Sequence, residues 1–133
     1  MKMIKKLSVL AAFAMFPFAV SGNYAEVAQP RIISPTGTVD ISNGAVEFKW
    51  YYNIRGTQGQ GGSYEIEVYK AGMMVQSNIV YEQKVPFGQD SLQVDAKLFQ
   101  PGQGYSWQIR FIKYDLRKSD WVTGSFKVSD GSK

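Results

Sequence analysis

The sequence predicts an all-β fold in which two antiparallel sheets pack face to face as a sandwich. Short stretches of alternating apolar and polar residues recur along the chain, and turn residues separate them. After the N-terminal segment, no stretch has the period of an amphipathic helix. The clearest strand starts at Tyr105, and Trp107, Ile109 and Phe111 share its apolar face. These observations favour a half-buried antiparallel strand as the repeated unit of the fold.

The N-terminal segment has the order of a secretory signal. Lysines at positions 2, 5 and 6 precede an apolar run, 7–20, and the small residues Ser21 and Gly22 follow it. The run is short for a membrane span, although an uncleaved anchor is the alternative. We therefore expect a signal peptide over 1–22 and export to the periplasm or the medium. The sequence has no cysteine, so neither a disulfide nor an N-terminal lipid-anchored cysteine is possible.

Composition excludes several classes of function. Without the three lysines of the signal, Lys and Arg fall from 15 to 12 against 11 acidic residues, so the formal charge of +4 becomes +1. The remaining chain has no long basic run, which argues against a nucleic-acid partner. The absence of both histidine and cysteine excludes Ser-His-Asp, Cys-His and zinc-type sites. We expect no enzyme activity, no cofactor and no metal.

The predicted domain covers residues 29–129, after a flexible leader, 23–28, and before a tail, 130–133. It contains about seven strands separated by turns, and the first lies at a sheet edge between Pro30 and Pro35. The predicted strands are 31–34, 45–52, 64–70, 79–85, 91–96, 105–113 and 121–128. A loop between the second and third of these, 53–63, is rich in glycine and is expected to be a flexible connection.

Alternation also assigns the core. The residues expected to point inward, besides those of the clearest strand, are Val46, Phe48, Trp50, Tyr64, Ile66, Val68, Leu92, Val94, Val122, Phe126 and Val128. Tyr105 directly follows the turn around Pro101 and Gly102. We expect its ring to pack inward while its hydroxyl bonds to the backbone of the preceding connection. Trp50, Tyr64, Pro101, Tyr105 and Trp107 are thus assigned structural roles.

Five motifs in order resemble a fibronectin type III domain over about residues 29–129. They are Pro30 to Pro35, Trp50 in Val-Glu-Phe-Lys-Trp, Tyr64 to Tyr69, the corner Phe99-x-Pro101-Gly102-x-x-Tyr105, and Ser119-Asp120-Trp121 followed by Phe126-Lys127-Val128. The last resembles the ending of bacterial members and half of the Trp-Ser repeat of cytokine receptors. The resemblance implies a seven-stranded immunoglobulin-like sandwich, in which the third and sixth strands are neighbours. The chain departs from the family in its context, because such domains usually stand as modules in long chains.

An outer cluster is the candidate binding surface. Counting alternation places Ile112, Tyr114 and Trp121 outward at one end of the last two strands, and Arg55 and Arg117 lie in loops at that end. Exposed aromatic residues can form a partner surface or a platform for sugar stacking. The alternative, which the Trp-Ser resemblance implies, is that Trp121 stacks over Arg110.

Other groups favour ordinary structural roles. Arg110 is the expected cross-strand partner of Glu65, which with Glu67 lies on an outward strand face. Asp115 and Asp120 are too few carboxylates for a calcium site. We therefore expect an exported, non-enzymatic domain that binds a protein partner and has no membrane span after cleavage. The alternatives are a carbohydrate-binding accessory module and a structural subunit that adds its edge strand to a partner sheet.

Overall fold

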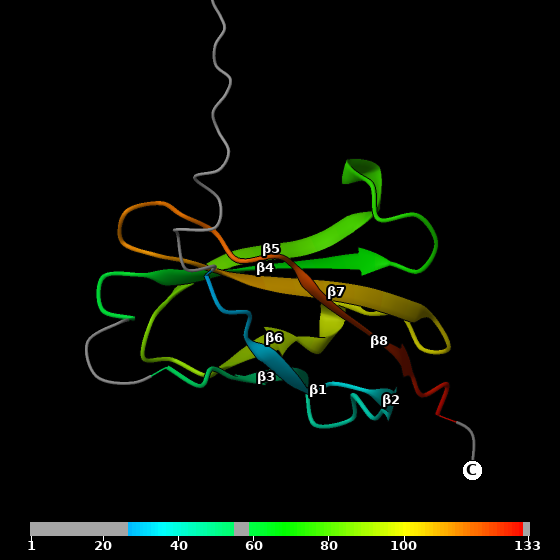
Figure 1. Ribbon diagram of the computed structural model, residues 1–133. Coiled ribbons are helices and arrows are strands. Elements are labelled where there is room, and N and C mark those ends of the chain that lie inside the picture. Colours follow the sequence, from blue (N-terminus) through cyan, green and yellow to red (C-terminus); the bar gives the residue numbers. More distant parts are fainter. Residues whose placement is uncertain (1–26, 55–58, 132–133) are drawn as a thin grey trace, which may run out of the picture.

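The computed structural model of the protein describes residues 27–54 and 59–131 (Figure 1). The strands are β1 (Arg31–Ser34), β2 (Gly37–Val39), β3 (Ala45–Tyr51), β4 (Ser63–Lys70), β5 (Ile79–Pro86), β6 (Ser91–Asp95), β7 (Gly104–Ile112) and β8 (Val122–Val128). Two short 3-10 turns, η3 (Gln76–Asn78) and η4 (Ala96–Leu98), precede β5 and β7. Among the described residues, no helix is long and apolar enough to cross a membrane.

The strands form two sheets that face each other (Figure 1). One has the order β1-β3-β6 and the other the order β2-β8-β7-β4-β5. The predicted two-sheet β-sandwich is therefore confirmed. The third and sixth predicted strands, here β4 and β7, pair antiparallel with Glu65 opposite Arg110. That register places alternate residues of both strands on the same outer face.

The sandwich has one strand more than the seven predicted. The additional strand is β2, which pairs parallel with β8 from Gly37 opposite Phe126 to Val39 opposite Val128. The sequence predicts turns over 35–44 because Thr36-Gly37 and Asn43-Gly44 are turn residues, and β2 is only three residues long. Its pairing depends on a partner about ninety residues away, which a local pattern does not reveal. The chain thus passes from one sheet to the other between β1 and β2.

The interior contains the predicted residues of both sheets. Phe48, Ile66, Trp107 and Ile109 have no exposed surface. Leu92 and Val122 are only partly buried, yet they pack against the same core. The Trp107 ring meets Phe48 edge-on at 4.9 Å between ring centroids, so the two sheets contact through aromatic side chains. Because no disulfide is present, this apolar core holds the fold together.

The predicted tyrosine corner is confirmed. The backbone N–H of Gln100 donates to the Tyr105 hydroxyl at 2.8 Å, and the Tyr105 ring is 2% exposed. Its ring packs against Phe99 and Phe126 at centroid distances of 5.0 and 5.6 Å. Asp95 accepts from the backbone N–H of Lys97 at 2.9 Å and so caps the neighbouring turn η4. The end of the sandwich that contains this corner is fixed by buried contacts.

One buried donor is poorly satisfied. The Trp50 indole N–H finds no acceptor at regular hydrogen-bond geometry among the described residues. Its interaction with the Tyr64 hydroxyl lowers the pKa of that tyrosine, so we interpret the contact as a weak, badly aligned bond. Burial has the larger effect and raises the pKa of Tyr64 to about 12. Trp50 nevertheless contributes through packing, with its ring 5.3 Å from that of Tyr64.

Candidate binding surface

Three connections and the start of the described chain lie at one end of the sandwich (Figure 1). We call this end, formed by residues 27–29, 52–54, 59–62, 87–90 and 113–121, the glycine-rich pole. Strand register explains the grouping, because Ser63 at the start of β4 pairs with Pro86 and Ile112 at the ends of β5 and β7. Arg31 at the start of β1 pairs with Tyr51 at the end of β3. Loops far apart in sequence therefore meet here.

The hairpin tip between β7 and β8 displays two large apolar side chains. Tyr114 is 68% exposed and Leu116 is 75% exposed. The tip is nevertheless closed by backbone hydrogen bonds, from Lys113 N–H to the Arg117 carbonyl at 2.8 Å and from Leu116 N–H to the Lys113 carbonyl at 2.9 Å. Leu116 has a φ of 73°. A left-handed conformation costs a bulky residue about 1–2 kcal/mol, so the surrounding contacts must hold it.

Asp115 and Arg117 supply some of the contacts that hold the tip in this conformation. The Asp115 carboxylate accepts from the Arg117 backbone N–H at 3.2 Å and from its guanidinium Nε at 3.0 Å. The backbone N–H of Arg117 and the nearby positive charges of Arg117 and Lys113 lower the pKa of the Asp115 carboxyl. The predicted surface residue Arg117 is exposed, but its charge is already paired within the tip. Both residues thus shape the tip and surround its apolar side chains with charge.

Glycines pack closely beneath the tip. A Cβ atom at Gly61 would lie 3.0 Å from Tyr114 Cβ, and one at Gly62 would lie 2.4 Å from the Phe111 ring and 2.7 Å from the Ile112 carbonyl oxygen. At Gly59, a Cβ would meet the Phe87 ring at 2.3 Å. At the described glycines of this loop, which we predicted as a flexible connection, an added Cβ atom would come closer to its neighbours than side chains normally pack. The predicted surface residue Arg55 lies outside the described residues.

The glycines rest on an aromatic base formed by Tyr52, Tyr64, Phe87 and Phe111. The Tyr52 and Phe111 rings lie 4.6 Å apart between centroids, and Phe87 and Phe111 lie 5.9 Å apart. Burial, with a smaller contribution from Tyr64, raises the pKa of Tyr52 to about 12. The Tyr52 hydroxyl donates to the Ala28 carbonyl at 2.7 Å. The aromatic base therefore packs against the loops of the pole, and its Tyr52 hydroxyl holds the start of the described chain.

The predicted cation–π alternative for Trp121 is confirmed. The guanidinium carbon of Arg110 lies 4.1 Å from the centroid of the Trp121 ring. The same guanidinium pairs with the Glu65 carboxylate, at 2.7 Å from Nε and 2.6 Å from Nη2. One face of the indole is thus covered by a side chain that is itself ion-paired. Trp121 and Tyr114 do not form one bare platform.

The prediction that Ile112 belongs to an exposed cluster is wrong. Alternation does place it on the opposite face from Phe111, but Ile112 is only 5% exposed. It pairs with Ser63 on one side and forms a bridge with Lys118 of the returning chain on the other. The loop folds back along the strand end and covers this position. Periodicity along a strand does not describe such a covering loop.

Leu116 was missed. The segment 114–120 connects the last two predicted strands, and one leucine among polar residues there gives no periodic signal. An apolar residue next to aspartate in a short hairpin loop was the available clue, because nothing in such a loop can bury it. The structure brings Tyr114 and Leu116 together at the tip and sets Trp121 apart on the outer sheet face.

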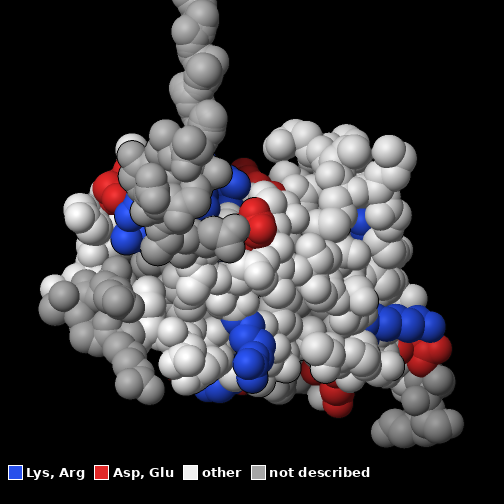
Figure 2. Space-filling view, in the orientation of Figure 1, with Lys and Arg blue, Asp and Glu red and all other residues white. Residues whose placement is uncertain are grey.

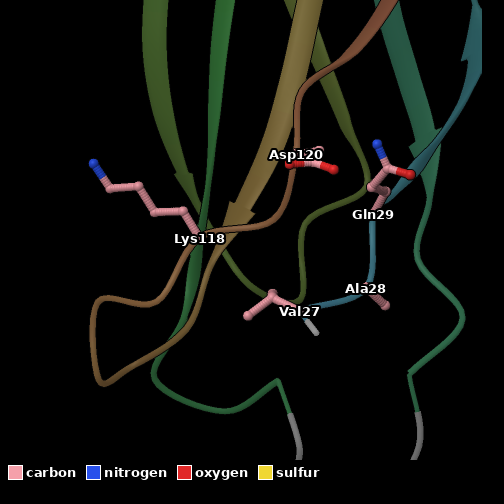
Figure 3. A pocket seen from close by; sticks show the side chains of 5 residues that line it. All are labelled: Val27, Ala28, Gln29, Lys118 and Asp120. Carbon is pink, nitrogen blue, oxygen red and sulfur yellow. The ribbon is translucent and has the colours of Figure 1, made fainter. Parts of the chain in front are cut away.

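A hollow of about 440 Å³ lies beside the tip, between the start of the described chain and the loop before β8 (Figure 3). It is lined by Val27, Ala28, Gln29, Lys118 and Asp120. The Lys118 side chain points away from the other four (Figure 3). Gln29 donates to the Trp121 carbonyl at 3.3 Å, which fastens the chain start to this loop. The hollow is polar and open, and its residues form the flank of the glycine-rich pole.

The outer face of the larger sheet carries polar groups that satisfy one another. The Tyr69 hydroxyl donates to Glu67 at 2.6 Å, and the Gln108 amide donates to the same oxygen at 2.7 Å. Tyr69 is buried on this face, and burial followed by the Glu67 interaction raises its pKa to about 12. Among the residues the structure describes, no three acidic side chains gather as a metal site. These groups act as a structural network across neighbouring strands.

Charge on the visible face is dispersed. In Figure 2, most of the described surface is uncharged, and the Lys and Arg side chains stand apart from one another or beside Asp and Glu. Where grey residues do not cover it, the described surface in this view has no continuous basic patch of the kind that a phosphate backbone requires. Any partner that meets this face encounters an uncharged surface with isolated charges.

Comparison with known proteins identifies structures of similar fold. No protein-family model and no curated protein match the sequence. Among solved structures, the chain is similar to a computationally redesigned β-sandwich protein, with 12% identity, a TM-score of 0.56 and coverage of 80% of this chain and 95% of that one. It is also similar to α-L-rhamnosidase from Dictyoglumus thermophilum, with 18% identity, a TM-score of 0.59 and coverage of 78% and 12%.

A third similar structure is that of the FN1–FN3 domains of chicken CNTN1, with 13% identity, a TM-score of 0.54 and coverage of 77% of this chain and 34% of that one. The chain thus spans small parts of the rhamnosidase and the CNTN1 fragment. At these identities, the likeness concerns the fold: an immunoglobulin-like or fibronectin-like β-sandwich. Function must be argued from the surface itself.

Proposed function

We propose that the protein is an exported binding domain of the fibronectin type III kind, which contacts a protein partner through the glycine-rich pole. One observation carries the proposal: Tyr114 and Leu116 are largely exposed on a hairpin tip. Backbone hydrogen bonds close this tip, and the neighbouring glycine loop packs against it. Large apolar side chains on a rigid protrusion lose little conformational freedom on binding, so they are suited to fill pockets of a partner. Surrounding charges would form the rim.

The family assignment is supported by contacts that the resemblance implies. Tyr105 makes the corner bond to the Gln100 backbone, and Trp121 stacks on Arg110. Glu65 and Arg110 pair across β4 and β7. Of these contacts, the Glu65–Arg110 pair joins residues that lie 45 positions apart in the sequence.

Export is proposed from the N-terminal segment alone. Its lysines, the apolar run 7–20 and the small residues that follow have the order of a cleavable signal. Intact-mass measurement of the protein recovered from outside the cytoplasm should give a chain that begins near Gly22 or Asn23. A chain that retains Met1 in the membrane fraction would contradict this part of the proposal.

Site-specific crosslinking tests the surface. A photoreactive phenylalanine analogue is placed at position 114, at 116, or at 73 as a control, because Met73 is 72% exposed in the connection between β4 and β5 at the opposite end. In cells that make the protein naturally, positions 114 and 116 should give the same crosslinked protein and position 73 should not. Equal crosslinking from all three positions, or none above background at 114 and 116, would refute the proposed surface.

A glycan screen separates the carbohydrate alternative. Because Arg110 covers one face of the Trp121 ring, we expect oligosaccharides to leave tryptophan fluorescence unchanged. Trp121→Ala should instead lower stability by about 0.5–1 kcal/mol through loss of the cation–π contact. Saturable glycan binding that disappears in Trp121→Ala would favour a sugar-binding module.

A further inference from the structure

The edge of the larger sheet at β5 is open. Among the described residues, β5 pairs with β4 and has no neighbour on its other side. It is eight residues long, whereas the other edge strands β1, β2 and β6 have four, three and five residues. From Tyr81 to Pro86 its register with β4 is regular, without a bulge or an internal proline. A regular, exposed edge of this kind offers backbone donors and acceptors to another strand.

The two faces of β5 differ. Tyr81, Gln83 and Val85 pair with the inward-facing residues of β4 and therefore point to the inner side. Glu82 and Lys84 are exposed on the outer side, and neither forms an ion pair with a described residue. These two opposite charges lie two residues apart on one face.

Neither of these charges forms an ion pair with the residue opposite it on β4. Glu82 lies opposite Glu67, and like charges in opposite positions are unfavourable. Lys84 lies opposite Glu65, but the Glu65 carboxylate is bound by Arg110 at 2.6 Å. A strand added beyond β5 could therefore improve the electrostatics if it placed a cation beside Glu82 and an anion beside Lys84.

A second copy of β5 does this in one register. When two copies pair antiparallel about a two-fold axis, residues that face each other must point to the same side of the joined sheet. The axis therefore passes through a residue position. An axis at Glu82 or at Lys84 would set that residue against itself, whereas an axis at Gln83 sets Glu82 of each copy against Lys84 of the other.

We propose that the protein forms a homodimer in which the β5 strands of two copies pair antiparallel, with Gln83 at the two-fold axis. On the inner side, this register sets Tyr81 of each copy against Val85 of the other, which is an apolar pair. The two five-stranded sheets become one continuous sheet. The glycine-rich poles then point in opposite directions, so both tips remain available. The dimer does not depend on the proposed function.

The expected affinity is modest. A single short strand pair buries less surface than stable dimers do, so we expect a dissociation constant of about 1–100 μM. Sedimentation of the purified exported protein over a concentration series from about 1 μM to about 1 mM should show a monomer that converts to a dimer. Low ionic strength favours detection, because exposed ion pairs are screened by salt.

Charge reversal tests the register. Glu82→Lys and Lys84→Glu each create two like-charge contacts and should weaken dimerisation by about tenfold or more. The double variant Glu82→Lys/Lys84→Glu exchanges the charges and should dimerise nearly as well as the original. An equal mixture of the two single variants should form a heterodimer, because each supplies the charge that the other lacks.

Two controls keep the test specific. Glu47→Lys reverses an exposed charge on β3 of the other sheet and should leave dimerisation unchanged. Glu82→Lys places a cation opposite Glu67, so its folded form should be no less stable than the original, and loss of the dimer cannot then be ascribed to unfolding. A chain that stays monomeric at the highest concentration, single variants that dimerise normally, or a mixture no better than its components would each overturn the proposal.

Discussion

Tyr105 and Tyr114 lie at opposite ends of the same strand and have opposite environments. Tyr105 opens the regular part of β7, is 2% exposed and accepts a backbone hydrogen bond. Tyr114 follows the end of β7, is 68% exposed and has its Cβ atom close to Gly61. One tyrosine thus stabilises a connection of the sandwich, and the other is displayed on a connection.

The two ends of the sandwich thus differ: buried contacts close one end, and the other end exposes apolar side chains. At the corner, ring and hydroxyl are both satisfied within the domain, so nothing remains for a partner. At the glycine-rich pole, close-packed glycines and an aromatic base hold the loops while the apolar side chains face outward. Rigid support beneath exposed apolar groups is the arrangement expected of a recognition surface.

The largest expected effect is loss of the core that both ends share. Trp50 is 1% exposed and lies beside Tyr64 of the aromatic base. Trp50→Ala should lower the free energy of unfolding by about 3–5 kcal/mol, which is enough to unfold a marginal domain. Urea denaturation measures it. A loss below about 1 kcal/mol would mean that the assigned core is wrong.

The second expected effect is a loss of stability of the folded domain at alkaline pH. Burial raises the pKa of Tyr52, Tyr64 and Tyr69 from 10.0 to about 12, so the folded state favours their neutral forms. Their contribution is complete below about pH 10 and is lost as the pH rises towards about 12. The free energy of unfolding across this window should fall, and Tyr52→Phe should make the fall shallower. A flat profile would contradict buried hydroxyls.

Gly62→Ala distinguishes a packed pole from a flexible one. The added Cβ would lie 2.4 Å from the Phe111 ring and 2.7 Å from the Ile112 carbonyl oxygen. We expect a loss of about 1–3 kcal/mol, as in other overpacked sites. Gln60→Ala, at an exposed position in the same loop, serves as the control. If both variants unfolded at the same urea concentration as the original, the glycine packing would be unimportant.

Tyr105→Phe isolates the hydroxyl of the corner. The ring contacts with Phe99 and Phe126 survive, and the Gln100 N–H loses its acceptor. The free energy of unfolding should fall by about 1 kcal/mol. Native-state hydrogen exchange should also show faster exchange of the Gln100 amide. An unchanged amide would indicate that the corner bond contributes little.

Much of the fold could be predicted because alternation records burial directly. Val46, Phe48 and Trp50 of β3 and the apolar face of β7 are all buried as expected. The additional strand, β2, could not be found from alternation. β2 is a short parallel addition to β8, and its existence depends on where a distant strand lies.

The candidate site was less predictable for a related reason. Whether Ile112 is exposed depends on the loop that folds beside it, and whether Leu116 is displayed depends on a left-handed backbone. Neither property has a periodic signature. The Arg110–Trp121 stack was anticipated because the motif around Trp121 implies it, rather than because its spacing does.

The most direct test of the proposed surface removes both exposed side chains and measures binding and stability together. Tyr114→Ala/Leu116→Ala leaves the hairpin bonds and the aromatic base in place. We predict that its dissociation constant for the protein captured by crosslinking rises by about 100-fold, since two anchors of about 1.4 kcal/mol each are lost. The free energy of unfolding should change by less than about 0.5 kcal/mol. An unchanged dissociation constant, or a loss of binding matched by a loss of stability, would contradict the assignment of the tip as the binding surface.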